Sequence, residues 1–309
     1  MKSNYVSLSG GLGNQLFQFA GALEISKGQK LTLLTKLGKP SSSGELQAEL
    51  FAFHLPTHVH IDSSGNSSRL IKKVSDLVLR SSSSHKIYLK PIRRILIQVF
   101  STAVFSLYFK ELISVPILKG TGYSTVLKSK KSKLLIGFFH SYLYASPREI
   151  FTELQLRNPD PLITEHLKRA QEENPLILHL RLGDYKKELG FGIPSIDYYR
   201  KAINFHFENS SHSRIWVFTN EVSIAHKFLP EEFTHLYDFI TEVAGSAAQT
   251  LEVMRFGTGY VIANSTYSWW GAYMSKNPAA LVTYPEPWFV SADVPNALIP
   301  PSWIGINRG

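Results

Sequence analysis

The chain contains no cysteine among its 309 residues. This absence excludes a disulfide scaffold, a thiolate zinc site, an iron–sulfur cluster and a catalytic cysteine. It also fits a protein of a reducing compartment. With 44% hydrophobic and 18% charged residues, the composition is otherwise that of a globular protein.

Secretion and membrane-spanning signals are also missing. The opening residues MKSNYVSLSGG run from a short apolar stretch into a glycine turn, which is typical of a first strand and not of a signal peptide. The best membrane candidate, residues 95–109, has only fifteen uncharged residues, whereas a spanning helix needs about 20. Because Arg93, Arg94 and Lys110 flank it, either an interfacial helix on anionic lipid or a helix buried in the core explains it. We therefore expect a cytoplasmic protein that contacts the inner membrane at most peripherally.

Several catalytic signatures do not occur. The sequence has no Asp-x-Asp, no His-Glu-x-x-His and no Cys/His spacing, so it predicts no metal site and no metal cofactor. It has no Gly-x-Ser-x-Gly elbow either, and a serine hydrolase is not indicated.

Positive charge is abundant but localised. The chain carries a net charge of +9, and residues 69–133 hold fourteen Lys or Arg against two acids, a net +12. Such a segment is typical of a face that docks on an anionic partner, or of a solvated surface. Its lysines do not alternate with aromatic residues as in proteins that bind single-stranded nucleic acid, so no nucleic acid is expected as a partner.

Short apolar runs alternate with helical patterns along the chain. We expect strands at 5–9, 30–34, 134–139, 176–180, 215–218, 260–263 and 280–284, and helices near 16–23, 164–173, 196–207, 224–229, 250–256 and 269–275. This alternation predicts an α/β protein with parallel sheets covered on both faces. At roughly 150 residues per domain, the proline-containing break at 158–161 separates two Rossmann-like domains, 1–160 and 161–309, which we expect to face a cleft. The basic segment is an insertion in the first domain.

The first motif is GGLGNQLFQFA at residues 10–20. A strand, a glycine turn and a helix start aim backbone N–H groups and a helix dipole at an anion, and Gly13 and Asn14 would face it. Asn14 is also a candidate cap of the helix. Leu16 replaces the third glycine of the dinucleotide fingerprint, so a plain tight turn explains the motif equally well.

The second motif is HLRLGDY at residues 179–185. Ligands of open parallel sheets bind beyond the carboxyl ends of the strands, which is where Arg181 leaves the sheet. Its planar guanidinium can hold two phosphate oxygens at once. His179 and Asp184 bracket it and would either position the arginine or transfer a proton. A structural Arg–Asp pair is the alternative.

Two further motifs place polar side chains after expected strands. In WVFTNE, at residues 216–221, Asn220 and Glu221 offer acceptors to a nucleotide base, although Asn220 is an equally good helix cap. In ANSTYSWWG, at residues 263–271, small polar groups converge with a helix N-terminus on one point, an arrangement suited to a diphosphate without a metal. The polar residues of this motif are Asn264, Ser265, Thr266 and Ser268.

Together with the terminal WIGIN at residues 303–307, these motifs resemble glycosyltransferase family 11, the α-1,2-fucosyltransferases. The resemblance runs from residue 10 to residue 307, and residues 36–133 carry none of it. It implies a GT-B architecture with GDP-L-fucose held mainly by the C-terminal domain. It also implies metal-independent, inverting transfer of fucose to the 2-hydroxyl of a terminal galactoside. The expected acceptor is a galactose-terminated glycan of a surface polysaccharide such as O-antigen.

The resemblance also implies roles for individual residues. Arg181 would hold the diphosphate and stabilise the leaving group, with His179 in the same motif. Gly13 and Asn14 would face the phosphates. Ser265, Thr266 and Ser268 would line the nucleotide. Asp184 and Glu188 are the candidate general bases because of their position near Arg181.

Three departures from the family pattern affect four positions. Leu182 stands where a second arginine is usual, Asn220 and Glu221 stand where two aspartates are usual, and Thr250 replaces an acidic residue. A transferase that uses a different nucleotide-sugar donor is therefore one alternative. An alternative of another class is a basic RNA- or membrane-surface-binding module with a relict transferase fold.

Overall fold

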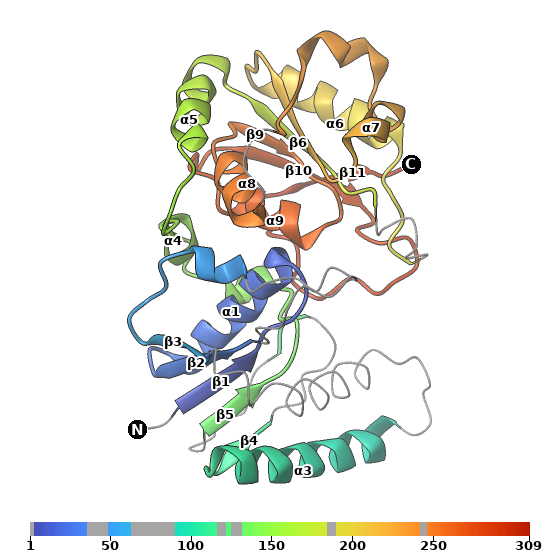
Figure 1. Ribbon diagram of the computed structural model, residues 1–309. Coiled ribbons are helices and arrows are strands. Elements are labelled where there is room, and N and C mark those ends of the chain that lie inside the picture. Colours follow the sequence, from blue (N-terminus) through green and yellow to red (C-terminus); the bar gives the residue numbers. More distant parts are fainter. Residues whose placement is uncertain are drawn as a thin grey trace. The chain divides into compact units, whose positions relative to one another are not determined.

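The computed structural model describes residues 3–35, 49–62, 90–115, 122–124, 132–183, 190–241 and 246–309. The chain forms two compact units (Figure 1). The first comprises Met1–Pro147 and Pro295–Leu298, and the second comprises Arg148–Val294 and Ile299–Gly309. The units thus divide at Pro147, whereas the sequence placed a domain boundary at residue 160.

The first unit is a parallel sheet with the strand order β3-β2-β1-β5-β4. Its described elements are β1 (Ser3–Ser7), α1 (Leu12–Ser26), β2 (Lys30–Leu34), the 3₁₀ helix η1 (Glu49–Ala52), β3 (Val59–Asp62), α3 (Lys90–Phe109), β4 (Ile113–Ser114), β5 (Ser132–Leu135) and η2 (Tyr142–Tyr144). The strand predicted at 30–34 is confirmed residue for residue. The first strand ends two residues earlier than predicted, and the chain then reaches Gly10 with a φ of +74°, a conformation that favours glycine.

Helices cover both faces of this sheet. Successive strand residues point to opposite faces, and Tyr5 of β1 stacks on Phe109 of α3 with the ring centroids 4.5 Å apart. Helix α1 packs against β1 from the other face (Figure 1). Gly21 allows α1 to pack closely, because a Cβ at this position would lie 2.5 Å from Cγ of Phe139.

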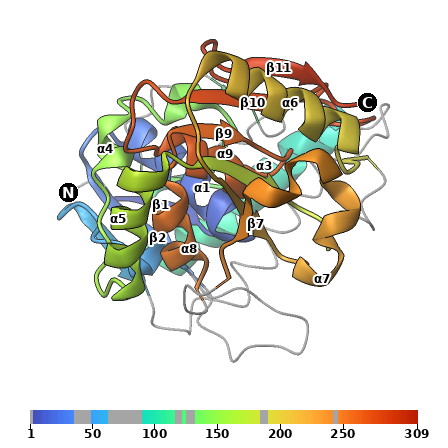
Figure 2. The ribbon, with the colours of Figure 1, turned by 90° about the horizontal axis from the view of Figure 1, so that it is seen from above.

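The second unit is a six-stranded parallel sheet with the order β11-β10-β9-β6-β7-β8. Its strands are β6 (Leu176–Leu180), β7 (Ile215–Thr219), β8 (Tyr237–Phe239), β9 (Gly259–Val261), β10 (Leu281–Glu286) and β11 (Ile304–Asn307). Its helices are α4 (Glu149–Thr152), α5 (Leu162–Glu173), α6 (Ile196–Asn209), α7 (Val222–Ala225), η4 (His226–Phe228), η5 (Glu231–Leu236), α8 (Ala247–Met254) and α9 (Thr266–Tyr273). From β6 the chain builds outward to β8, then crosses to β9 and builds outward to β11 (Figure 2). This is the doubly wound order of a Rossmann domain.

Both faces of strand β6 pack against helices of the second unit. Leu178 and Leu180 pack with Ile203 of α6 in one buried cluster. His179 points to the opposite face, where its ring lies 5.7 Å from that of Tyr267 on α9. Trp269 and Trp270 of α9 are both fully buried, so they pack in the core of this unit.

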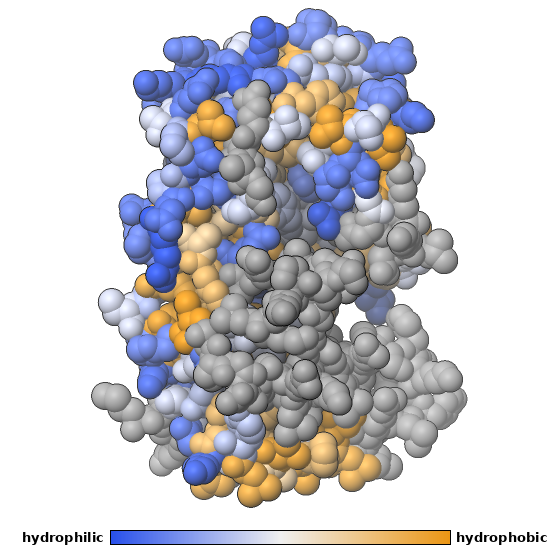
Figure 3. Space-filling view, in the orientation of Figure 1, coloured by the Kyte–Doolittle hydropathy of each residue, from blue (hydrophilic) through white to orange (hydrophobic). Residues whose placement is uncertain are grey.

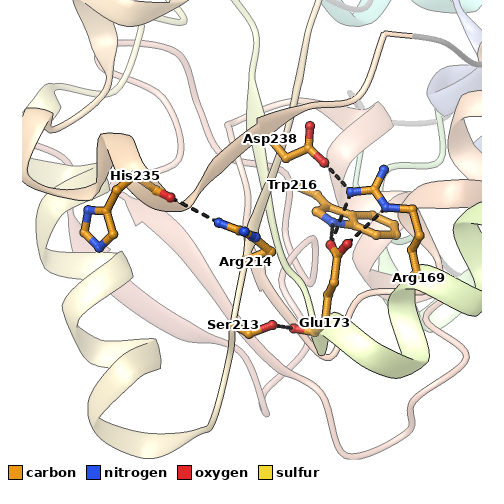
Figure 4. A network of polar contacts seen from close by, with 7 residues as sticks. All are labelled: Arg169, Glu173, Ser213, Arg214, Trp216, His235 and Asp238. Carbon is orange, nitrogen blue, oxygen red and sulfur yellow. Dashed lines mark hydrogen bonds and ion pairs between the residues drawn. The ribbon is translucent and has the colours of Figure 1, made fainter.

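A polar network stabilises the start of β7 (Figure 4). Trp216 Nε1 donates to Glu173 Oε2 at 2.6 Å, and Glu173 also accepts from Arg169 Nε at 3.0 Å. Arg169 in turn pairs with Asp238 of β8 and lies over the Trp216 ring, 5.1 Å from its centroid. Since Trp216 lies near the amino end of its strand, this network joins α5 to the sheet at the edge opposite the carboxyl ends of the strands.

The uncharged stretch at 95–109 lies within α3. Ile97 and Phe105 face the core, but Leu96 and Leu107 are exposed. The interpretation as a helix buried in the core is therefore wrong, because only one stripe of α3 contacts the sheet. None of the helices in the described part of the chain is long and apolar enough to cross a membrane.

Candidate functional site

The second unit has its topological switch point between β6 and β9, where the chain reverses the direction in which it adds strands. Ligands of doubly wound sheets bind in the crevice beyond the carboxyl ends of the strands at such a point. Leu180 of β6 pairs with Thr219 of β7, and Leu178 of β6 pairs with Val261 of β9. The loops that follow these three strands therefore leave the sheet at one edge. Each loop carries polar residues of one of the motifs described in the sequence.

Arg181 follows β6 directly and is partly exposed at this edge. His179, two residues earlier, is buried in the strand. Burial, with the positive charge of Arg181 as a second cause, lowers the pKa of His179 to about 3. The imidazole is thus neutral near pH 7, and it does not have the pKa of an efficient general base at that pH.

Gly183, Asn220 and Glu221 come together beside Arg181. A Cβ at Gly183 would lie 2.7 Å from Asn220 Nδ2 and 3.1 Å from Glu221 Oε1, so a side chain at this position would have to displace the ends of these two side chains. Asn220 Oδ1 accepts a hydrogen bond from the backbone N–H of Leu182 at 3.1 Å. The interpretation of Asn220 as a helix cap is wrong, because the N-cap position of α7 is Glu221 and carries no side-chain cap.

The hydrogen bond of Asn220 changes the expectation for base recognition. Its carbonyl oxygen already accepts from the loop that carries Arg181, which leaves Glu221 as the better acceptor of the pair for a base edge. Leu182 is fully buried in the core of the second unit. The residue at this position therefore contributes to packing, and its side chain does not point toward the carboxyl edge.

The cluster after β9 is largely occupied by contacts within the loop. Ser265 is the N-cap of α9, and its Oγ accepts from the N–H of Tyr267 at 3.3 Å. Ser268 is fully buried and donates to the carbonyl of Ala263 at 3.0 Å. Thr266, in the first turn of α9, is partly exposed. The N-terminus of α9 follows β9, the strand next to β6, and its dipole favours an anion at this edge of the sheet.

Asn264 and Arg308 hold the segment that returns from the second motif. Asn264 Nδ2 donates to the carbonyls of Phe191 and Gly192 at 2.9 and 3.0 Å. Arg308 is buried and donates from Nη2 to the carbonyl of Phe191 at 3.2 Å. Arg308 was not predicted from the sequence, although a charged residue directly after the apolar WIGIN was a signal. The candidate bases Asp184 and Glu188 lie outside the described residues.

The first unit has its own switch point, at β1. Gln18 joins the loops there, since its Oε1 accepts from Ser9 N–H at 2.9 Å and its Nε2 donates to the carbonyl of Gly137 at 3.2 Å. Gly13 and Asn14 lie in the first turn of α1, whose N-cap is Gly11 without a side-chain cap. The prediction that Asn14 caps this helix is therefore wrong.

Asn14 has instead a partner that the sequence analysis missed. Its Oδ1 lies 3.1 Å from Nε2 of His140. Burial lowers the pKa of His140 to about 3, so the ring is neutral near pH 7 and Nε2–H donates to the amide oxygen. The signal available was the position of His140 directly after the predicted strand 134–139, the same rule that selected Asn220.

The described residues contain no group of three His, Asp or Glu side chains that could hold a metal ion. Among the described residues that follow β6, β7 and β9, the polar groups are one guanidinium, one carboxylate, two amides, hydroxyls and a helix N-terminus. This is a donor-rich set with a single carboxylate acceptor, which suits a phosphorylated ligand with a base.

The family model of "Glycosyl transferase family 11" matches residues 3–307. The O-antigen biosynthesis glycosyltransferase WbnK of Escherichia coli is 26% identical over 98% of this chain and 100% of its own length. An alpha-1,2-colitosyltransferase of Escherichia coli is 25% identical over 58% of this chain and 64% of its own length.

Among solved structures, the NodZ alpha-1,6-fucosyltransferase co-crystallised with GDP aligns with a TM-score of 0.50 and 13% identity, covering 89% of this chain and 93% of that one. This likeness shows the fold, and the predicted α/β GT-B class with Rossmann-like units is confirmed. The family match over nearly the whole chain shows more: this chain belongs to glycosyl transferase family 11.

Proposed function

We propose that this glycosyltransferase moves L-fucose from GDP-β-L-fucose to the 2-hydroxyl of a terminal galactoside, with inversion and without a metal ion. The observation that carries the proposal is the placement of Arg181 and the N-terminus of α9 on the two sides of the switch point, after β6 and β9. A cation and a helix dipole in that arrangement hold a diphosphate. Glu221, after β7, is then the acceptor for the base.

The reaction is a single displacement. The 2-hydroxyl oxygen of galactose attacks C1 of fucose, the bond from C1 to the β-phosphate oxygen breaks, and GDP leaves with the electron pair. Negative charge develops on the β-phosphate, so Arg181 and the α9 N-terminus stabilise the transition state more than the ground state. The acceptor proton passes to a base, for which Asp184 and Glu188 are the candidates.

The other predicted residues have supporting roles in this proposal. Neutral His179 positions the strand end from which Arg181 leaves. Ser265 and Thr266 shape the α9 N-terminus that faces the diphosphate. The expectation that Gly13 and Asn14 contact the phosphates stays a prediction.

The acceptor that we propose is a galactose-terminated, lipid-linked precursor of a surface polysaccharide. The relative WbnK is named for O-antigen biosynthesis, which supports this choice. Such an acceptor would place the reaction at the inner leaflet, where peripheral contact with anionic lipid holds the enzyme near its substrate.

Incubation of the purified protein with GDP-fucose and a panel of β-galactosides tests the proposal. We expect a mass gain of one deoxyhexose, with the linkage at the 2-hydroxyl established by NMR. An Arg181→Ala variant that keeps full transfer activity would show that the diphosphate is bound elsewhere. Absence of GDP binding by the wild-type protein in calorimetry would refute the donor.

A second candidate is the same reaction with a different nucleotide-sugar. It is favoured by the 25% identity to an alpha-1,2-colitosyltransferase and by Asn220 and Glu221 at positions where two aspartates are usual. Calorimetric competition of GDP against UDP and ADP identifies the base. Transfer assays with several GDP-deoxyhexoses then identify the sugar.

A further inference from the structure

Helix α3 presents a contiguous apolar surface to solvent. Its outward residues Ile95, Leu96, Val99, Phe100 and Leu107 are 61%, 64%, 63%, 56% and 82% exposed. We call these five residues the α3 apolar face. Figure 3 shows hydrophobic surface gathered over this helix, at the bottom of the view.

The opposite side of α3 is apolar as well. Ile97 and Phe105 are buried against the sheet of the first unit, and Phe109 stacks on Tyr5. A helix on the surface of a soluble protein normally turns charged and polar residues to water. Exposed apolar residues that follow one another along a helix face mark an interaction site.

Basic residues occupy both ends of this helix in the sequence. Lys90, Arg93 and Arg94 stand in its first turns and Lys110 directly follows its last residue, and the sequence has no acid between Asp76 and Glu111. An apolar helix face bordered by cations is the pattern of a helix that lies in the plane of an anionic bilayer. Packing of two copies through this face would bring the basic ends of both helices together and is disfavoured by their repulsion.

The attachment of α3 to its own sheet defines how it can meet a membrane. Because the stripe with Ile97 and Phe105 is committed to the core, the helix cannot enter a bilayer lengthwise. It can lie flat on the surface, with the apolar face at the boundary of headgroups and acyl chains.

We propose that the α3 apolar face is the surface by which this glycosyltransferase docks on an anionic membrane. The biological purpose of the docking rests on the proposed function, since a lipid-linked acceptor would be presented there. The docking itself requires neither donor nor acceptor.

Co-sedimentation with vesicles tests the proposal. We expect the full-length protein to bind vesicles of phosphatidylglycerol and phosphatidylcholine, and to bind pure phosphatidylcholine vesicles at least about tenfold more weakly. The Leu96→Gln/Leu107→Gln double variant keeps helix-forming residues at both positions and should bind the anionic vesicles at least about tenfold more weakly. Leu167→Gln, at an exposed leucine of α5, is the matched control and should bind as the wild type does.

Three results would overturn the proposal. In the first, the wild type does not bind anionic vesicles. In the second, the double variant binds them as tightly as the wild type, which would show that the basic charges alone are responsible for binding. In the third, the wild type is a dimer in solution that the double variant converts to a monomer, which would assign the face to a second copy. Calorimetry with GDP on the same samples keeps the two proposals separate, because loss of the docking leaves GDP binding intact and absence of GDP binding leaves the docking intact.

Discussion

Glu221 is expected to read the base of the donor, and its replacement by glutamine isolates that contribution. A carboxylate can accept from both the N1–H and the 2-amino group of guanine. An uncharged amide offers one carbonyl oxygen, together with an NH₂ group that meets the donors of the base unfavourably. Asn220 is a weaker acceptor for the base, because it is uncharged and its Oδ1 already accepts from the backbone N–H of Leu182.

The magnitude follows from the hydrogen bonds at stake. A hydrogen bond to a charged group contributes about 1.5–3 kcal/mol net, and Glu221 is only partly buried, so solvent reduces its share toward the lower bound. At about 1.4 kcal/mol per factor of ten, Glu221→Gln should raise the Kd for GDP by about tenfold to thirtyfold.

Calorimetry with GDP and with inosine diphosphate, which lacks the 2-amino group, is the assay. The wild type should prefer GDP, and Glu221→Gln should lose most of that preference because the second hydrogen bond is already missing. Glu231→Gln, at an exposed glutamate of η5, makes the same chemical change away from the switch point and should bind both nucleotides as the wild type does. The reasoning is refuted when Glu221→Gln retains both the affinity for GDP and the discrimination against inosine diphosphate.

Three further predictions concern the diphosphate, pH and metals. Arg181→Ala should lower kcat by about 10²–10³-fold through loss of transition-state stabilisation without changing the Tm, whereas Arg214→Ala, at an exposed arginine, should leave steady-state kinetics unchanged. Burial lowers the pKa of His140 and His179 to about 3 and that of His206 to about 4. In the unfolded chain these histidines take up protons near pH 6.5, so the free energy of unfolding should fall as the pH drops from about 6.5 toward 4. The fall should be at most about 1.4 kcal/mol per pH unit for each ring. Urea titrations at pH 7, 6 and 5 that give equal free energies of unfolding would contradict this. Transfer should persist after dialysis against EDTA, and activity that returns only with added Mg²⁺ or Mn²⁺ would overturn the metal-independent mechanism.

Local sequence patterns were sufficient for most of the elements that position the site. The strands at 30–34 and 176–180 were predicted residue for residue, because each is a short apolar run bounded by turn residues. β8 was missed: it has three residues, all of them only partly buried, and leaves too short a pattern to recognise. The interpretation of residues 95–109 as a core helix failed for another reason, since an apolar run does not reveal how much of its surface the rest of the chain covers.

The sequence by itself determined that the chain alternates strands and helices, that Arg181, Glu221 and Ser265 each follow a strand, and that these motifs resemble one enzyme family. Periodicity and turn chemistry are local properties, so they can be read from neighbouring residues. Only the tertiary structure decided the strand order that places β6 beside both β7 and β9. It also decided that the amide of Asn220 serves the backbone of Leu182. These are contacts between residues that are distant along the chain, and the packing of the whole sheet selects them.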